Sequence, residues 1–289
     1  MPELPEVETV RRGLEPVLKG RKITRVETRR DDLRFPFPPG FATRLSGAKV
    51  EQLSRRAKYI LVDLDNGFSL LVHLGMTGRF TVLSPEGAAN LGEFYFEGGA
   101  GQGADGPHDH VVFHLEEGVR LVYSDPRRFG MMDLVETQAA NQHKLLRDIG
   151  VEPLGNGLSA DYLAQKFKDK TAPLKAALLN QRIIAGLGNI YVCEALFRAK
   201  LSPKRKAGKV KPDKLGELVR HVRDILDEAI LAGGSTLQDF QGADGTKGEY
   251  QQRFLVYDRE GEPCPNCGKP IKRLVQSGRS SFYCASCQK

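Results

Sequence analysis

The chain has 289 residues, of which 40% are hydrophobic and 27% are charged, and its formal net charge is +7. These values are typical of a globular protein with about two domains, and they exclude disordered and fibrous classes. No stretch approaches the roughly 20 consecutive apolar residues of a membrane span, and the N-terminus lacks the features of a signal peptide. We therefore expect a cytoplasmic protein that does not bind membranes.

The basic excess lies toward the C-terminus. Residues 200–289 carry 17 basic and 11 acidic side chains, a net charge of +6, which leaves +1 for the first 199 residues. A polyanion such as nucleic acid is one partner that suits this segment. A surface that only keeps the protein soluble is the alternative, and charge by itself leaves it open.

The first residues combine a nucleophile with a helix. Met1 precedes a small residue and is expected to be removed, which would leave a secondary amine at Pro2 beside the carboxylate of Glu3. An α-amino group titrates near pH ~8, against ~10.4 for lysine, so this amine is a usable nucleophile. Its adduct with a sugar aldehyde carbon would be an iminium that has no N–H to lose. A frayed terminus is the alternative. Apolar spacing predicts a helix over residues 5–19, interrupted or bent near Pro16.

Residues 22–136 consist of short alternating runs separated by turn residues, a pattern that predicts an antiparallel β-sandwich or barrel. The expected strands are residues 22–29, 49–53, 59–64, 69–74, 79–83, 93–96, 110–115, 119–124 and 131–135. The Gly-rich stretch 98–107 is interpreted as a mobile loop insertion, and the sequence does not give its role.

After residue 136 the apolar periodicity becomes that of helices, which are expected at residues 158–167, 174–179, 191–199 and 212–231. The turn containing Gly186 and Gly188 precedes a helix, where backbone N–H groups can bind phosphate, although a plain tight turn has the same sequence. Residues 233–254 are rich in glycine and predict a long surface loop. An α+β chain of four segments follows, with boundaries 1–136, 137–232, 233–254 and 255–289.

Four cysteines near the C-terminus have the spacing of a zinc ribbon. Cys264 and Cys267 are separated by two residues, as are Cys284 and Cys287, and sixteen residues lie between the pairs. Four thiolates fill a tetrahedral shell, so a single Zn²⁺ ion bound there would be structural. Disulfides are the alternative, which a reducing compartment disfavours. Cys193 lies in an apolar helix and is expected to be a core residue.

Taken together, these motifs resemble the bacterial formamidopyrimidine-DNA glycosylases, bifunctional enzymes that remove oxidised purines. The matching stretches, in chain order, are residues 2–8 (PELPEVE), 55–59 (RRAKY), 73–79 (HLGMTGR), 108–110 (HDH), 125–130 (DPRRFG) and 186–191 (GLGNIY), followed by the four cysteines. The resemblance implies an N-terminal helix with an antiparallel β-sandwich, a helix-two-turn-helix domain and a C-terminal zinc-finger hairpin. It implies one structural Zn²⁺ and, as partner, double-stranded DNA that contains oxidised purines or abasic sites. It also implies a monomer in the bacterial cytoplasm that associates with the nucleoid through DNA.

The resemblance assigns catalytic roles to four residues. Pro2 would attack C1′ of the damaged nucleotide, and Glu3 would protonate the sugar or the leaving group. Lys58 would contact phosphate and act in β-elimination, and Arg279 would act in δ-elimination. The residues alone leave other readings open, because Glu3 suits a helix N-terminus and Lys58 suits a solvated strand.

The resemblance also assigns residues that bind DNA. Glu6 would be a supporting carboxylate. Met76, Arg127 and Phe129, called the wedge residues below, would fill the space that an extruded nucleotide leaves in the duplex. Core packing is the alternative for Met76 and Phe129. Further DNA contacts are implied for His108, Lys170 and Asn189, and the loop 233–254 would close over the flipped base.

Two other functions fit part of the sequence. The sister glycosylase for oxidised pyrimidines, endonuclease eight, shares Pro2 and the zinc finger, but Leu4 and the intact stretch 125–129 favour the purine enzyme. A non-catalytic zinc-ribbon protein that binds DNA would explain the cysteines and the charge. It would leave Pro2, Glu3 and Lys58 without a role.

Overall fold

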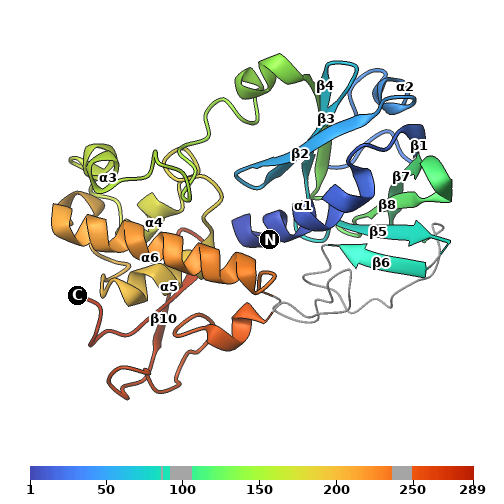
Figure 1. The fold of residues 1–289 in the computed structure, drawn as a ribbon. Helices are drawn as coiled ribbons and strands as arrows, with labels where there is room; N and C mark the ends of the chain where they lie inside the picture. Colours follow the sequence, from blue (N-terminus) through green and yellow to red (C-terminus); the bar gives the residue numbers. More distant parts are fainter. Residues whose placement is uncertain (86, 92–105, 236–248) are drawn as a thin grey trace. The chain divides into compact units, whose positions relative to one another are not determined.

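The computed structural model describes residues 1–85, 87–91, 106–235 and 249–289 (Figure 1). Two compact units are present: Met1–Arg147 with Ala232–Glu249, and Asp148–Leu231 with Tyr250–Lys289. The four segments expected from the sequence are a finer division and remain a prediction. No helix in these described ranges is long and apolar enough to cross a membrane.

The first unit begins with helix α1, Leu4–Leu18. Glu3 is its N-cap residue and forms a capping box with Glu6 at position N3. Pro5 lies in the first turn, where its missing N–H costs no hydrogen bond. The sequence PELPE therefore sets the start of this helix by itself.

Helix α1 buries one face. Val7, Val10 and Leu14 are each about 1% exposed and join the core of the first unit. There the helix packs against strands β2, Val50–Arg56, and β3, Tyr59–Leu64. The helix continues through Pro16 and ends two residues later, so the predicted interruption is wrong, and the alternative of a bend there stays a prediction. Proline lacks one N–H and so removes a single backbone hydrogen bond, and the burial of one face of α1 in the core offsets that loss.

Two antiparallel sheets follow (Figure 1). Among the described residues, one sheet has the order β1-β7-β8-β5-β6 and the other β2-β3-β4-β9. The strands are β1 Ile23–Thr28, β2 Val50–Arg56, β3 Tyr59–Leu64, β4 Phe68–His73, β5 Arg79–Ser84, β6 Gly87–Leu91, β7 Asp109–Leu115, β8 Arg120–Ser124 and β9 Met131–Glu136. The predicted antiparallel sandwich is confirmed.

The two sheets share one hydrophobic core. Ile60 and Val62 of β3 and Val111 and Phe113 of β7 alternate along their strands, and all four are buried in the same cluster. This is the period of two that the sequence pattern indicated. Strand β6 and the short helix α2, Phe41–Leu45, were not expected. The expected strand at 93–96 and most of the loop at 98–107 lie outside the described residues.

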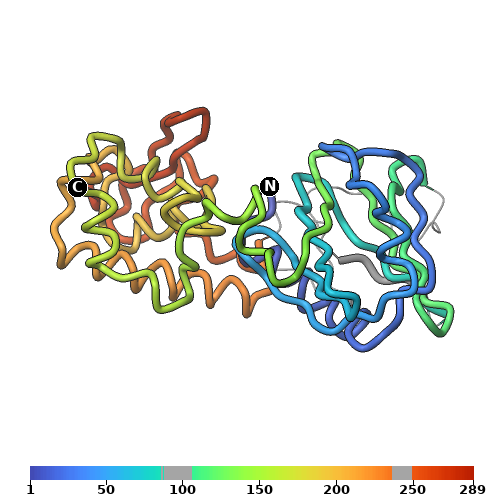
Figure 2. The backbone as a smooth tube through the Cα atoms, turned by 90° about the horizontal axis from the view of Figure 1, so that it is seen from above, coloured from blue at the N-terminus to red at the C-terminus, as the bar shows by residue number. Residues whose placement is uncertain are grey.

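The second unit contains four α-helices in its described part: α3 Ala160–Phe167, α4 Leu174–Leu178, α5 Asn189–Arg198 and α6 Pro212–Leu231. They confirm the helices expected from the periodicity to within about two residues at each end. The Ser159 side chain caps α3 by accepting a hydrogen bond from the Tyr162 N–H at 3.1 Å. Helix α6, orange in Figures 1 and 2, has 20 residues. Short 3-10 helices occur at Glu116–Gly118, Thr137–Gln142, Ala207–Lys209 and Tyr250–Arg253.

A C-terminal hairpin packs on helix α5. Strands β10, Lys272–Gln276, and β11, Arg279–Tyr283, pair antiparallel. Cys193 and Phe197 of α5 share a buried cluster with Ile271, Phe282 and two of the hairpin cysteines. Cys193 is 2% exposed, which confirms the prediction that it is a core residue.

Helix α5 also holds the segment that leads into the hairpin. The buried carboxylate of Glu194 accepts hydrogen bonds from the backbone N–H groups of Leu255, Val256 and Tyr257 at 2.8–3.0 Å. Burial raises the pKa of Glu194, and the three N–H donors oppose that rise. One side chain thereby fixes the path of three consecutive residues.

Candidate functional site

The N-terminal segment is held inside the first unit. Pro2 is buried, Glu3 is 4% exposed and Glu6 is 2% exposed. The Glu3 N–H donates to Glu6 Oε2 at 2.9 Å, so the residue beside Pro2 has a fixed position. The alternative of a frayed terminus does not fit this arrangement.

A cavity of about 590 Å³ lies beside this segment in the first unit. Its lining includes Met1, Arg34, His73, Met76, Arg127 and Phe129. All three wedge residues therefore face the same space as the start of the chain. They come from two loops, one after β4 and one before β9, which the sequence separates by about fifty residues.

Glycine allows these two loops to touch. Gly75 has a φ of +68°, and a Cβ atom built on it would lie 2.3 Å from the Gly130 nitrogen and 2.4 Å from the Phe129 carbonyl carbon. A side chain at this position would overlap the neighbouring backbone. The close approach brings Met76, next to Gly75, beside Phe129.

A buried carboxylate holds the loop before β9. Asp125 is fully buried and accepts hydrogen bonds from the Gly130 N–H at 2.7 Å and from the Thr77 hydroxyl. The Thr77 oxygen in turn accepts the Arg127 N–H at 3.2 Å. Both ends of the segment from Arg127 to Gly130 are therefore tied to the loop that carries Met76.

Two wedge residues are exposed and stacked on one another. The Phe129 ring is 43% exposed, and the Arg127 guanidinium carbon lies 4.8 Å above its centre. Met76 is half-buried. Phe129 is thus not a core residue, and the pair presents a flat apolar and cationic surface to the cavity.

Lys58 and His73 add positive charge and a hydrogen-bonding ring to the same region. Lys58 lies in the tight turn between β2 and β3 and is only 6% exposed, which excludes the reading of a solvated strand lysine. Burial is the main cause that lowers the pKa of His73 to about 4, and the nearby charges of Lys58, Arg34 and the N-terminus act in the same direction. His73 Nδ1 accepts the Gly75 N–H at 3.0 Å, which suits a neutral ring.

The sequence interpretation did not single out His73 or Arg34. His73 belongs to the stretch HLGMTGR, so its motif was visible although its position at the cavity was not. Arg34 lies in a turn with no recognised motif, and its N–H donates to the Gly130 carbonyl at 3.0 Å. The exposed residue His108 is joined to the loop before β9 because its carbonyl accepts the Asp125 N–H at 3.0 Å.

In the second unit, two of the predicted residues meet at the hairpin. Asn189 Nδ2 donates to the Ser280 carbonyl at 3.0 Å, directly beside the exposed Arg279. The Asn189 Oδ1 atom is buried and has no hydrogen-bond partner within the described residues. Lys170 is exposed, and its carbonyl accepts the Gly208 N–H, away from these contacts.

The sequence interpretation also missed a buried lysine beneath this hairpin. Lys175 of α4 has no exposed surface. Its Nζ donates to the Ser280 carbonyl at 2.8 Å and to Ser281 Oγ at 2.7 Å. A lysine among the apolar residues of a short helix was the only available signal.

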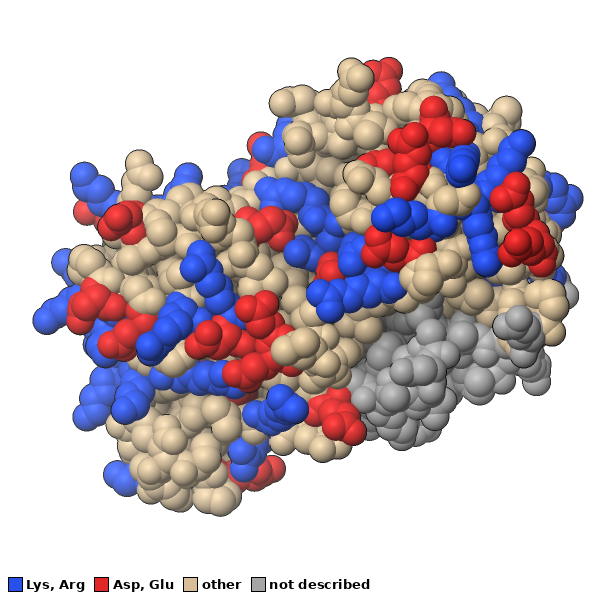
Figure 3. Space-filling model, viewed as in Figure 1, with Lys and Arg blue, Asp and Glu red and all other residues tan. Residues whose placement is uncertain are grey.

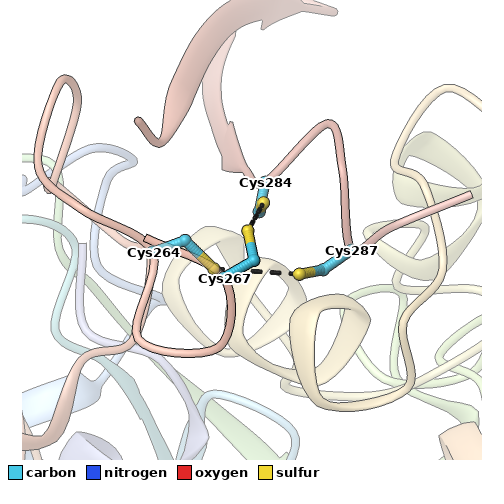
Figure 4. A group of neighbouring side chains, drawn as sticks. All are labelled: Cys264, Cys267, Cys284 and Cys287. Carbon is cyan, nitrogen blue, oxygen red and sulfur yellow. Dashed lines mark hydrogen bonds between the residues drawn. The ribbon is translucent and has the colours of Figure 1, made fainter. Parts of the chain in front are cut away.

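The four hairpin cysteines converge on one point (Figure 4). All four sulfur atoms lie within 4.8 Å of one another; Cys264 and Cys287 are 3.9 Å apart, and Cys267 and Cys284 are 3.5 Å apart. Disulfides would need about 2.05 Å. Ligands at about 2.3 Å from a tetrahedral zinc are roughly 3.8 Å apart, so the cluster fits one structural Zn²⁺.

Charge does not mark a separate patch on the face shown in Figure 3. On the side shown in Figure 3, Lys and Arg side chains lie among Asp and Glu side chains over both units. The net charge of +7 therefore does not locate a functional site on this face.

Three family models match successive parts of the chain. They are the formamidopyrimidine-DNA glycosylase N-terminal domain over residues 1–132, the H2TH domain of the same enzymes over residues 149–241, and the zinc finger found in FPG and IleRS over residues 261–289. This combination defines a class of DNA-repair glycosylases with a helix-two-turn-helix domain and a zinc finger.

Relatives agree over the whole length. Formamidopyrimidine-DNA glycosylases of Ruegeria pomeroyi and Rhizobium etli are each 55% identical, with full coverage of both chains. The crystal structure of MutM (Fpg) from Thermus thermophilus is similar at a TM-score of 0.83 and 39% identity, covering 99% of this chain and 98% of that one. Lactococcus lactis Fpg bound to DNA with an abasic site gives 0.85 at 31% identity, covering 99% of each. The chain belongs to the formamidopyrimidine-DNA glycosylase family.

Proposed function

We propose that this protein is a bifunctional DNA glycosylase and AP lyase of base excision repair that removes oxidised purines such as 8-oxoguanine and formamidopyrimidines. The observation that carries the proposal is the buried Pro2-Glu3 segment beside a cavity lined by Met76, Arg127 and Phe129. Membership of the family supports the purine substrate over oxidised pyrimidines. It also disfavours a non-catalytic zinc-ribbon protein.

Pro2 and Glu3 carry out base release. Once Met1 is removed, the lone pair of the Pro2 amine forms a bond to C1′ of the damaged nucleotide, and the bond from C1′ to the base breaks with its electron pair going to the base. Glu3 supplies a proton to the sugar or the leaving base. Its fixed place beside Pro2 supports this role. The Pro2 nitrogen then loses its proton, and its lone pair forms a double bond to C1′ as the C1′–O4′ bond breaks with its electron pair going to O4′, which takes up a proton. The product is an iminium that joins the protein to the ring-opened sugar.

The wedge residues compensate for the extruded nucleotide. Flipping a nucleotide costs about a few kcal/mol of stacking and pairing, and side chains that fill the gap offset that cost. The half-buried Met76 and the exposed, stacked pair of Arg127 and Phe129 have the apolar and planar surfaces that this needs. The Arg127 guanidinium can donate to the unpaired base of the opposite strand.

Lys58 and Arg279 act after base release. The iminium acidifies C2′, whose proton is lost as the 3′ C–O bond breaks, and Lys58 serves this β-elimination and binds phosphate. Arg279 serves the δ-elimination that follows. The low exposure of Lys58 near His73 and the support of the Arg279 hairpin by Asn189 agree with these roles.

The remaining groups bind the duplex. His108, Lys170 and Asn189 contact DNA, and Glu6 is a supporting carboxylate. Zn²⁺ held by the four cysteines keeps the hairpin folded and takes no part in the chemistry. The loop 233–254 closes over the flipped base; most of it lies outside the described residues. The protein acts as a monomer on chromosomal DNA in the bacterial cytoplasm.

The test is covalent trapping on a duplex that carries 8-oxoguanine opposite C. Borohydride added during the reaction should reduce the iminium and lock the protein to DNA, and the adduct should map to the N-terminal peptide. A form that retains Met1 should bind DNA but neither cross-link nor cleave abasic sites. Cross-linking at Lys58, or normal cleavage by the extended form, would show that the nucleophile is misassigned.

A further inference from the structure

One carboxylate joins the start of the chain to a segment 229 residues away. Glu6 Oε2 accepts the Glu3 N–H at 2.9 Å. Glu6 Oε1 accepts both the Ser235 N–H at 2.8 Å and the Ser235 hydroxyl at 2.9 Å. Every one of these contacts donates to the carboxylate, and the N-terminus of α1 favours its negative charge.

The backbone before Ser235 fits closely against Glu6. Gly234 has a φ of +85°, and a Cβ atom built on it would lie 3.1 Å from the Cγ atom and 3.2 Å from the Oε1 atom of Glu6. Such contacts are tighter than those that most real Cβ atoms make, so only glycine lets the chain approach this side chain without displacing it. Both Glu6 and Ser235 are buried, at 2% and 4% exposure.

Ser235 belongs to a small closed structure. It pairs antiparallel with Glu249, and the Glu249 N–H donates to the Ala232 carbonyl at 3.2 Å. Residues 232–235 together with Glu249 are called the root here, because the chain between them starts and returns at this point. Glu6 binds the root through two hydrogen bonds.

Resting on the proposed function, we propose that Glu6 is a positioning residue that couples the root to the Pro2-Glu3 segment. The two carboxylate oxygens share one rigid plane, so a shift of the root that turns this plane also moves the acceptor of the Glu3 N–H. Pro2, the nucleophile next to Glu3, is then correctly placed only when the root keeps its hydrogen bonds to Glu6. Ser235, which no motif marks, thereby affects chemistry at Pro2.

The coupling predicts an effect of Ser235 on a substrate that has no base. An abasic site has no base to recognise. If Ser235 acted only in base recognition, replacing it would therefore leave borohydride trapping on abasic DNA unchanged. Ser235→Ala removes one of the two hydrogen bonds to Glu6 and should slow single-turnover borohydride trapping on abasic duplex about 3–10-fold. Glu6→Gln turns an N–H donor toward one of its present donors and should slow this trapping about 10–100-fold.

Controls separate positioning from stability. Ser69→Ala removes another buried hydroxyl, which donates to the Asp63 carboxylate at 2.6 Å, and should leave trapping unchanged at a comparable loss of Tm. Ser235→Thr keeps the hydroxyl and should restore the rate, whereas Gly234→Ala should lower it. If both Ser235→Ala and Gly234→Ala trap on abasic DNA at the wild-type rate, the coupling is overturned. Failure of the wild-type protein itself to trap would instead count against the proposed function.

Discussion

The contact between Gly75 and the loop before β9 gives a sharp test of the wedge geometry. The substitution Gly75→Ala adds a single methyl group at a φ of +68°, where it would lie 2.3 Å from the Gly130 nitrogen. The nearest atoms in this direction belong to backbone, so no side chain can simply turn away. The loop that carries Arg127 and Phe129 must move.

The expected size of the effect follows from two contributions. A Cβ atom in the left-handed region costs about 1–2 kcal/mol of unfolding free energy. Restoring an ordinary contact of 3.4 Å from 2.3 Å requires a displacement of about 1 Å, and overpacking of this kind costs about 1–3 kcal/mol more. Displacement of the catalytic surroundings by about 1 Å lowers rates by up to about 100-fold.

Gly67 provides the matched control. It lies in the turn between β3 and β4 with a φ of +82°, and nothing lies within 4 Å of a Cβ built on it. Gly67→Ala should therefore lower the unfolding free energy only by the cost of a Cβ atom in the left-handed region, and it should keep full activity. Urea unfolding measures the stability of both variants. Single-turnover excision of 8-oxoguanine opposite C and opposite A measures the wedge.

Gly75→Ala should excise the lesion about 10–100-fold more slowly than Gly67→Ala and discriminate less between C and A in the opposite strand. Discrimination should fall because the displaced Arg127 no longer faces the unpaired base. If the two variants match in both stability and excision, the loops do not touch as described and the assignment of Phe129 and Arg127 to the wedge is refuted.

Two further predictions concern the metal and pH. Cys264→Ser should abolish zinc binding, measured by atomic absorption, and with it DNA affinity, because Arg279 lies on the hairpin that the metal folds. The sandwich core should stay folded. Undiminished DNA affinity in zinc-free protein would contradict this prediction. His73 has a folded-state pKa of about 4 against 6.5 for the unfolded chain, so below pH 6.5 the unfolded state takes up a proton that the folded state does not. Stability should therefore fall by up to about 1.4 kcal/mol per pH unit between pH 6.5 and 4, with no further loss from this group below pH 4. His73→Gln should flatten the slope, and an unchanged slope would argue against the buried neutral ring.

Local patterns were enough for much of the fold. The period of 3.6 located α1 and α6, because each buries one continuous face. The period of two located most strands of the sandwich. The spacing of four cysteines predicted the zinc site, because it brings two pairs of thiolates together across a hairpin. These are Cys264, Cys267, Cys284 and Cys287. Pro16 does not interrupt α1, because the loss of one backbone hydrogen bond is small beside the burial of a whole helix face.

Long-range contacts needed the tertiary structure. Arg34, His73 and Phe129 come from three separated segments, and their common cavity exists only because the β-sheets bring those segments together. Lys175 beneath the hairpin carries no periodic signal. The bond between Glu6 and Ser235 spans almost the whole chain, and no local preference of either residue encodes it. The sequence by itself determined the zinc site and the sandwich and predicted the nucleophile, since spacing and periodicity are local properties. The tertiary structure decided which side chains surround Pro2, since that depends on how distant loops pack.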